Sequence, residues 1–244
     1  MTRLLALLAL LSLSSAAHAT TCRDLSFEDT SFSVCEARST DDLRLFLNGP
    51  TGAYGGFAAL QAGLQAKGQT LAFAMNAGMY QPDLSPVGLY IEDGRQLSPI
   101  ITTDGPGNFG LLPNGVFCIS ATGFSVTESR AFKAKPPACR YASQSGPMLV
   151  IAGALHPLFK PGSDSLNIRN GVGVSADGQT AFFAIANSPV NFTRFARLFR
   201  DALSTPNALY FDGSISRILA PELGRSGAGF SIGPIVGLVI PGAK

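Results

Sequence analysis

Pairs of β-prone runs recur along this chain, and they constrain its fold more than any other feature. Each pair places apolar, β-branched and aromatic residues on both sides of a short turn. The four pairs occupy residues 87–100, 114–129, 146–155 and 170–186. Runs joined by so short a turn pair antiparallel, because a parallel crossover needs a dozen or more residues. The sequence therefore predicts β-hairpins as the main building unit.

Two other segments have the apolar spacing of amphipathic helices. In residues 55–69, Phe57, Leu60 and Leu64 fall on one face, and Gly68 is placed to end the helix. The second helix is expected over residues 191–203, with an apolar face of Phe192, Phe195, Phe199 and Leu203. Because strands dominate and helices interrupt them only twice, the predicted fold class is α+β. We expect a mixed, largely antiparallel β-sheet core with covering helices, in a single domain.

The N-terminus has the features of a secretory signal peptide. Arg3 precedes an apolar run from Leu4 to Leu13, and residues 17–19 read Ala-His-Ala, a small-x-small cleavage pattern. We expect residues 1–19 to be cleaved and residues 20–244 to form one exported domain, periplasmic or secreted. No later segment reaches the roughly 18 apolar residues of a membrane helix, so no membrane span is expected.

The four cysteines fall as two close pairs, Cys22 with Cys35 and Cys118 with Cys139. In an exported protein an even number of cysteines indicates disulfides. Four cysteines allow three connectivities, and nearest-neighbour pairing closes the shortest loops. The alternative, a metal site, has less support because no Cys-x-x-Cys spacing occurs.

Composition argues against several classes of function. The chain has 18 basic and 16 acidic residues, a net charge of +2, and no basic run that would attract nucleic acid. His156 lies between apolar residues without a Gly-x-Ser-x-Gly nucleophile motif, so a serine hydrolase triad is not expected. Zinc chemistry lacks imidazole ligands, and nucleotide chemistry lacks a phosphate-binding glycine loop. We expect no cofactor, although the sequence leaves a divalent cation possible.

Polar residues stand where several apolar strands begin or end: Asn76, Ser145, Arg169, Asn170 and Asp212. A strand end fixes a side chain, and a neighbouring glycine leaves room for a ligand. Asp212 has a second interpretation, because Asp-Gly between β-prone runs is typical of a tight turn. The same dipeptide recurs at residues 93–94, 104–105 and 177–178. Local pattern alone does not distinguish the two interpretations.

Four short elements resemble, in the right order, those of the phosphodiester glycosidase family. They are "NAGMY" from Asn76, "SGPML" from Ser145, "RNGVGV" from Arg169 and "ALYFDGSIS" from Ala208. The resemblance runs from about Leu71 to Ile240. It implies an enzyme that hydrolyses a sugar-1-phosphodiester, releasing the sugar and leaving a phosphate monoester.

The resemblance also implies roles for individual residues. Asp212 is expected to stabilise the oxocarbenium-like centre electrostatically, to trap it covalently, or to activate the water that attacks it. Arg169 is expected to bind the phosphate. Asn76 completes the expected catalytic set. The expected substrate-binding residues are Ser216, Gly213, Ser145, Gly146, Asn170, Gly78 and, as a fainter candidate, Asn114. Ser216 is preferred to Ser214 because the family serine follows the aspartate by four places.

Two departures from the family pattern leave the substrate open. The chain has Ser214 where many members have a second glycine, and Ala77 where many have the middle glycine of Asn-Gly-Gly. The expected partner is a sugar-phosphate or phosphoglycan substrate. The alternative to an enzyme is a non-catalytic periplasmic protein that binds phosphoglycans or assists envelope or exopolysaccharide assembly.

Overall fold

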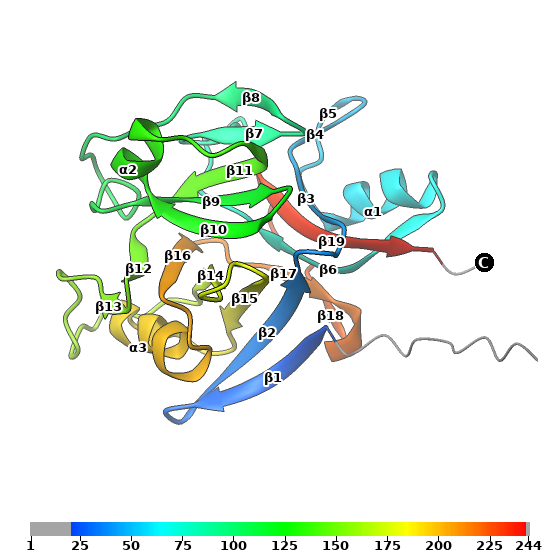
Figure 1. The fold of residues 1–244 in the computed structure, drawn as a ribbon. Coiled ribbons are helices and arrows are strands. Elements are labelled where there is room, and N and C mark those ends of the chain that lie inside the picture. The colour runs from blue at the N-terminus through cyan, green and yellow to red at the C-terminus, as the bar shows by residue number, and fades with distance from the viewer. Residues whose placement is uncertain (1–20, 243–244) are drawn as a thin grey trace, which may run out of the picture.

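Antiparallel strands form three main sheets in residues 21–242, the part of the chain that this computed structural model describes (Figure 1). The first sheet has the order β1 (Cys22–Phe27), β2 (Thr30–Arg38), β15 (Thr180–Ala186), β14 (Asn170–Val174), β16 (Asn207–Asp212), β12 (Met148–Ile151) and β13 (Ala154–Leu155). The second has the order β10 (Gly123–Glu128), β9 (Gly115–Ser120), β11 (Cys139–Ser145), β7 (Tyr90–Glu92) and β8 (Arg95–Ser98). The third has the order β18 (Arg225–Ser226), β17 (Ile218–Ala220), β6 (Gln69–Asn76), β19 (Ile235–Pro241) and β3 (Leu43–Phe46).

A small ribbon of β4 (Asn48–Gly49) and β5 (Gly52–Ala53) follows β3. The predicted signal peptide, residues 1–19, lies outside the described residues. The four predicted hairpins are confirmed as β7–β8, β9–β10, β12–β13 and β14–β15, each antiparallel. Asp93 and Gly94 close the first of them with φ of 50° and 78°, as a primed turn requires. This Asp-Gly is therefore a hairpin corner.

Helices cover the sheets largely where the apolar spacing predicted them. Helix α1 (Phe57–Gln65) buries Phe57, Leu60 and Leu64 against the third sheet, and Gly68 follows with a φ of 67°. Helix α3 (Phe192–Arg197) continues as a π-helical turn, η1 (Leu198–Ala202), over the first sheet. A 3-10 turn, η2 (Pro221–Leu223), joins β17 to β18. No helix among residues 21–242 has the length and apolar character to cross a membrane.

The structure adds a third helix, α2 (Ser129–Ala134), that the sequence analysis did not predict. The carboxylate of Glu128 accepts a hydrogen bond from the backbone N–H of Ala131 at 2.8 Å and so caps the helix. The helix has six residues, too few to show a helical period. The one sequence signal for this helix was Glu128, a residue able to cap a helix at the end of a predicted strand.

Aromatic side chains from all three sheets meet in one core. Phe183 of β15 lies 5.4 Å from Phe73 of β6 and 5.7 Å from Phe117 of β9, between ring centroids. Phe117 also contacts Phe211 of β16 at 6.5 Å. All four are fully buried, and each such burial contributes roughly 1.5–3 kcal/mol. The three sheets therefore share one buried core.

A stack of rings attaches the segment 156–168 to α3. His156 stacks on Phe159 at 4.8 Å, and Phe159 stacks on Phe192 at 4.9 Å. Phe192 in turn meets Tyr210 of β16 edge-on at 4.8 Å. His156 is 2% exposed, and this burial lowers its pKa. His156 therefore packs in the interior as part of this ring stack.

The nearest-neighbour disulfides are confirmed. Cys22–Cys35 joins β1 to β2, and Cys118–Cys139 joins β9 to β11. The Cα atoms lie 4.0 Å and 5.6 Å apart, so each bridge crosses between adjacent strands. The second bridge holds β11, whose far end carries Ser145.

Removal of the second disulfide should lower stability without changing the fold. The loop that it closes spans 21 residues, so Cys118→Ala with Cys139→Ala should reduce the free energy of unfolding by about 3 kcal/mol. Urea unfolding followed by circular dichroism measures this. An unchanged unfolding midpoint would mean that the bridge does not restrict the unfolded chain.

Stability should fall as the pH drops below about 6.5, because the unfolded chain protonates His156 more readily than the folded protein does. His156→Phe keeps a ring on Phe159 and removes the titration. We expect the variant to lose part of the pH slope between pH 7.5 and 5 in urea unfolding. Identical slopes for both proteins would contradict this.

Candidate active site

Strand ends from all three sheets meet at one place. Asn76 is the last residue of β6, and Ser145 is the last residue of β11. Asn170 begins β14 directly opposite Asp212, which ends β16. Each of the three sheets thus contributes at least one polar side chain. This convergence is the candidate site.

Two asparagines join the first and third sheets. The side-chain amide of Asn170 donates to the carbonyl oxygen of Asn76 at 2.9 Å and to its side-chain oxygen at 3.0 Å. The Asn76 side-chain oxygen also accepts the backbone N–H of Arg217 at 2.9 Å. The hydroxyl of Ser216 lies 3.2 Å from the side-chain oxygen of Asn170 and 2.9 Å from the carbonyl oxygen of Asp212. The predicted residues Asn76, Asn170, Asp212 and Ser216 therefore form one network, in which the two asparagines are buried and Ser216 is half-buried.

Asp212 keeps one carboxylate oxygen free. Its Oδ1 accepts backbone N–H groups from Gly213 at 2.6 Å, Ser214 at 2.8 Å and Ile215 at 3.4 Å. Within residues 21–242, Oδ2 has no hydrogen-bond partner. The carboxylate is therefore oriented by its own turn, and the residue as a whole is 9% exposed.

The Asp212-Gly213 turn is not a hairpin corner. The strand before it, β16, pairs with β14 and β12 in the first sheet, while β17 after it pairs with β6 in the third. The chain therefore crosses between sheets at Asp212. By contrast, Asp177 lies in the hairpin turn between β14 and β15.

Asp212 lines a cavity of about 500 Å³, which we call the Asp212 pocket. Its lining residues are Met79, Tyr80, Val87, Pro106, Gly107, Asn108, Phe109, Asp212, Ser214 and Ile215. Pockets of this size hold small organic ligands. The Tyr80 hydroxyl donates to the carbonyl of Ser231 at 2.8 Å. Burial raises the pKa of Tyr80, and the negative charge of Asp212 adds to that rise.

Arg169 lies behind this pocket, fully buried, and is not among the lining residues. Its Nε donates to the carbonyl of Val190 and its Nη2 to the carbonyl of Ser165, both at 2.8 Å. Its Nη1 donates to the hydroxyl of Tyr210 at 3.4 Å. Burial lowers the pKa of Arg169, but a guanidinium keeps its charge in proteins. Within residues 21–242, no carboxylate forms an ion pair with it.

The remaining predicted residues support the walls of the site. Ser145 donates to the carbonyl of Phe211 at 2.9 Å, and Asn114 donates to the carbonyl of Phe109 at 2.9 Å. Gly78 has a φ of 155°, and a methyl group there would lie 2.9 Å from the hydroxyl of Ser143.

Gly146 and Gly213 are glycines because of close neighbours. A methyl group on Gly146 would lie 2.5 Å from Cβ of Asn114, and one on Gly213 would overlap the hydroxyl of Tyr210. The absence of a side chain at Gly146 therefore lets the backbone approach Asn114, and its absence at Gly213 lets the backbone approach Tyr210.

Sequence reasoning missed Tyr80, Asn108, Phe109 and Tyr210. Tyr210 had no signal, because an irregularity in the pairing between Tyr210 and Asp212 interrupts the alternation by which residues two apart share a face. Tyr80 closes the "NAGMY" element. Asn108 and Phe109 lie in an irregular segment, for which local pattern predicts no position.

Metal and cofactor ligands are scarce in the described part of the chain. Residues 21–242 contain no group of three or more His, Cys, Asp or Glu side chains placed to hold a metal ion. All four cysteines are in disulfides. The polar groups of the site are amides, hydroxyls, backbone N–H groups and one carboxylate.

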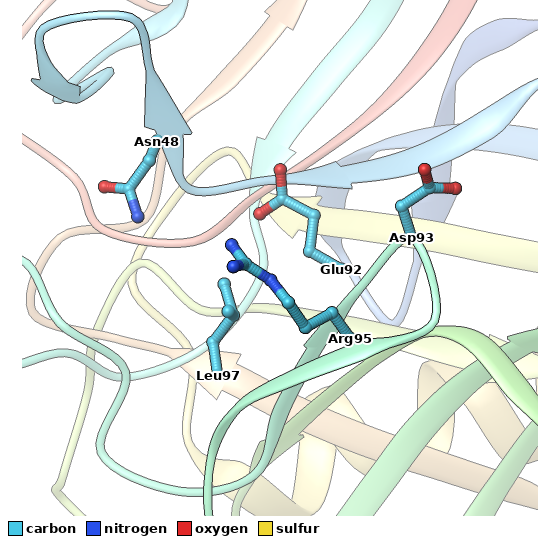
Figure 2. Close-up of a pocket in the computed structure, with 5 residues that line it drawn as sticks. All are labelled: Asn48, Glu92, Asp93, Arg95 and Leu97. Atoms are coloured by element: carbon cyan, nitrogen blue, oxygen red, sulfur yellow. The ribbon is translucent and has the colours of Figure 1, made fainter.

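A second cavity, of about 370 Å³, lies between β4 and the β7–β8 hairpin (Figure 2). Asn48, Glu92, Asp93, Arg95 and Leu97 line it, and none of them was a predicted site residue. Glu92 Oε2 accepts hydrogen bonds from Tyr90 and from the backbone of Leu47. Burial raises the pKa of Glu92. This cavity is lined by none of the converging strand ends.

Comparisons with known proteins agree on one family. A family model described as phosphodiester glycosidase (NAGPA) matches residues 69–227. The uncharacterized protein YigE of Escherichia coli (strain K12) is 37% identical over 166 residues, 68% of this chain. That stretch spans 64% of YigE, less than two thirds of its length.

Two solved structures share the fold. The catalytic domain of zebrafish N-acetylglucosamine-1-phosphodiester alpha-N-acetylglucosaminidase, auto-inhibited by its pro-peptide, has a TM-score of 0.59 at 14% identity, covering 89% of this chain and 81% of that one. A candidate exported protein from Burkholderia pseudomallei K96243 has a TM-score of 0.50 at 12% identity, covering 86% and 74%. Since the family model matches well over half of the sequence, this chain belongs to the phosphodiester glycosidase family.

Proposed function

We infer that this protein is a hydrolase that cleaves a sugar-1-phosphodiester, releasing the sugar from a phosphate monoester. The observation that carries this proposal is the Asp212 carboxylate, which is fixed through one oxygen and has the other free beside a 500 Å³ pocket. Family membership supports the choice of substrate class. The zebrafish neighbour is itself an N-acetylglucosamine-1-phosphodiester glycosidase.

Asp212 would act at the anomeric carbon. Cleavage of the C1–O bond leaves positive charge on the sugar ring, which a carboxylate stabilises. The phosphate departs with the electrons of the broken bond, and water then supplies the oxygen that bonds to C1 and releases one proton to the solvent. A phosphate monoester is a good leaving group, so a single carboxylate suffices without a strong general acid. The three backbone N–H groups on Oδ1 keep the free oxygen directed at the pocket.

The positive charge of Arg169 would stabilise the negative charge of the departing phosphate without contacting it. Its nitrogens already donate to Val190, Ser165 and Tyr210, so we assign it an electrostatic role from behind the pocket wall. Charges act strongly at such a place because the interior has a low dielectric constant. Tyr80 and Phe109 offer ring surfaces to the sugar or to the group beyond the phosphate.

Export is part of the proposal. The two disulfides are typical of oxidising compartments, and a structural neighbour is a candidate exported protein. Cleavage after residue 19 would release residues 20–244 as a periplasmic or secreted domain. Mass spectrometry of the protein recovered from the periplasm measures that N-terminus.

Asp212→Asn should abolish most turnover. Loss of the carboxylate should reduce kcat by at least about 100-fold, because an amide stabilises the developing positive charge poorly. The assay is release of free sugar from methyl phosphodiesters of N-acetylglucosamine, glucose and mannose. Asp177→Asn is the matched control, since Asp177 also precedes glycine and accepts a backbone N–H through Oδ1.

The control variant should keep wild-type turnover. Full activity of Asp212→Asn with an active wild type would refute the role of Asp212. Saturable binding of the diesters without any product from the wild type would instead favour the phosphoglycan-binding alternative.

Isotope labelling should locate the broken bond. Hydrolysis in water enriched in ¹⁸O should place the label on the released sugar, because water attacks the anomeric carbon. Mass spectrometry of both products reads the position. Label on the phosphate would mean that the P–O bond breaks, and the protein would then be a phosphodiesterase of another kind.

A further inference from the structure

Tyr210 connects the buried Arg169 to the Asp212 turn. It lies on β16 two residues before Asp212, on the other side of an irregularity in the pairing with β14: Tyr210 lies opposite Gly171 and Asp212 opposite Asn170, so the two side chains leave opposite faces of the strand. The tyrosine is fully buried, and its hydroxyl accepts a hydrogen bond from Nη1 of Arg169 at 3.4 Å. A single side chain thus touches the buried Arg169 and precedes the carboxylate of the site in the chain.

The hydroxyl of Tyr210 also packs against the turn itself. A methyl group on Gly213 would overlap this hydroxyl, so the backbone that follows Asp212 rests directly on it. That backbone supplies the N–H groups that hold the Asp212 carboxylate. The phenol therefore supports the turn that orients the carboxylate.

Phe192 fixes Arg169 and Tyr210 relative to each other. The guanidinium carbon of Arg169 lies 3.6 Å from the centre of the Phe192 ring, which meets the Tyr210 ring edge-on at 4.8 Å. A cation over a ring face is held more strongly away from water. The arginine and the tyrosine therefore have little freedom to part.

The Tyr210 hydroxyl lies between Arg169 and a residue of the pocket wall. Arg169 donates to the phenol oxygen, and within residues 21–242 this hydroxyl donates to no acceptor. Burial raises the pKa of Tyr210, while Arg169 opposes and Asp212 adds to that rise, so the phenol stays protonated. The side chain of pocket residue Asn108 also lies within hydrogen-bonding reach. A neighbouring cation strengthens the phenol as a donor toward that side.

We propose that Tyr210 is a positioning residue for the reaction: it supports the Asp212 turn and conveys the charge of Arg169 to the pocket wall. This role rests on the proposed function. It explains why a fully buried arginine without a carboxylate partner is retained beside the site. It also explains why residue 213 is a glycine, because a side chain there would overlap the Tyr210 hydroxyl.

Tyr210→Phe tests the role by removing one oxygen atom and keeping the ring. We expect kcat to fall about tenfold or more with KM within about twofold of wild type, because the substrate does not touch Tyr210. Tyr90→Phe is the matched control: it is also fully buried, and its hydroxyl bonds to Glu92, away from the Asp212 pocket. The control should keep wild-type kcat. Thermal unfolding of both variants separates loss of stability from loss of turnover.

Gly213→Ala provides a second, coupled test. The added methyl group should displace the turn and lower kcat, and it overlaps the Tyr210 hydroxyl rather than the ring, whose nearest carbon lies 3.2 Å away. Adding Tyr210→Phe should therefore raise the kcat of Gly213→Ala toward that of Tyr210→Phe alone. Simple additivity of the two losses would overturn the proposed contact.

The outcomes separate this inference from the proposed function. If the wild type turns over and Tyr210→Phe matches Tyr90→Phe in kcat, the positioning role is wrong and the function stands. A loss of turnover accompanied by an equal loss of folded protein would also overturn the role. Absence of turnover in the wild type would overturn the function and this role together.

Discussion

Hydrogen bonds between two buried asparagines hold the centre of the molecule together. Asn76 ends a strand of the third sheet, Asn170 begins a strand of the first, and both are fully sealed from solvent. A buried amide left without partners would cost about 1–3 kcal/mol, so the two sheets must meet where these amides pair. The same pair binds Arg217 and lies within reach of Ser216, the residues that lead the chain away from Asp212. The same asparagine side chains thus join the two sheets and form part of the site.

The position of Asp212 follows from this junction. The chain leaves the first sheet at Asp212 and enters the third at β17, so the turn between them has both ends anchored. Backbone N–H groups of that turn bind one carboxylate oxygen of Asp212, and the residue lines the pocket. A carboxylate held in this way loses little freedom when it meets a ligand, which favours catalysis and binding alike. On this account Arg169 and Tyr210 influence the reaction without contacting the substrate, because neither lines the Asp212 pocket.

Local pattern predicted the hairpins and two helices because period and turn chemistry are local properties. It did not predict α2, whose six residues are held by a single cap. The order of the four family elements singled out Asn76, Asn170, Asp212 and Ser216, which the fold brings together. Phe109 and Asn108 could not be predicted, because their segment is placed by long-range contacts. Among these, the Asn108 side chain lies beside Tyr210, and the Phe109 ring packs so close to Gly88 that a methyl group there would lie 2.6 Å from it. The burial of Arg169 was likewise invisible, since it depends on α3 and on the segment before β14.

The most direct test is a crystal structure of Asp212→Asn with a sugar-1-phosphodiester bound. The account predicts the ligand in the Asp212 pocket, with the anomeric carbon next to the side chain of residue 212 and the sugar or its aglycone against Tyr80 and Phe109. It also predicts that Arg169 stays buried against Tyr210. A ligand bound in the cavity of Glu92 and Arg95, with the Asp212 pocket empty at saturating concentration, would contradict the account.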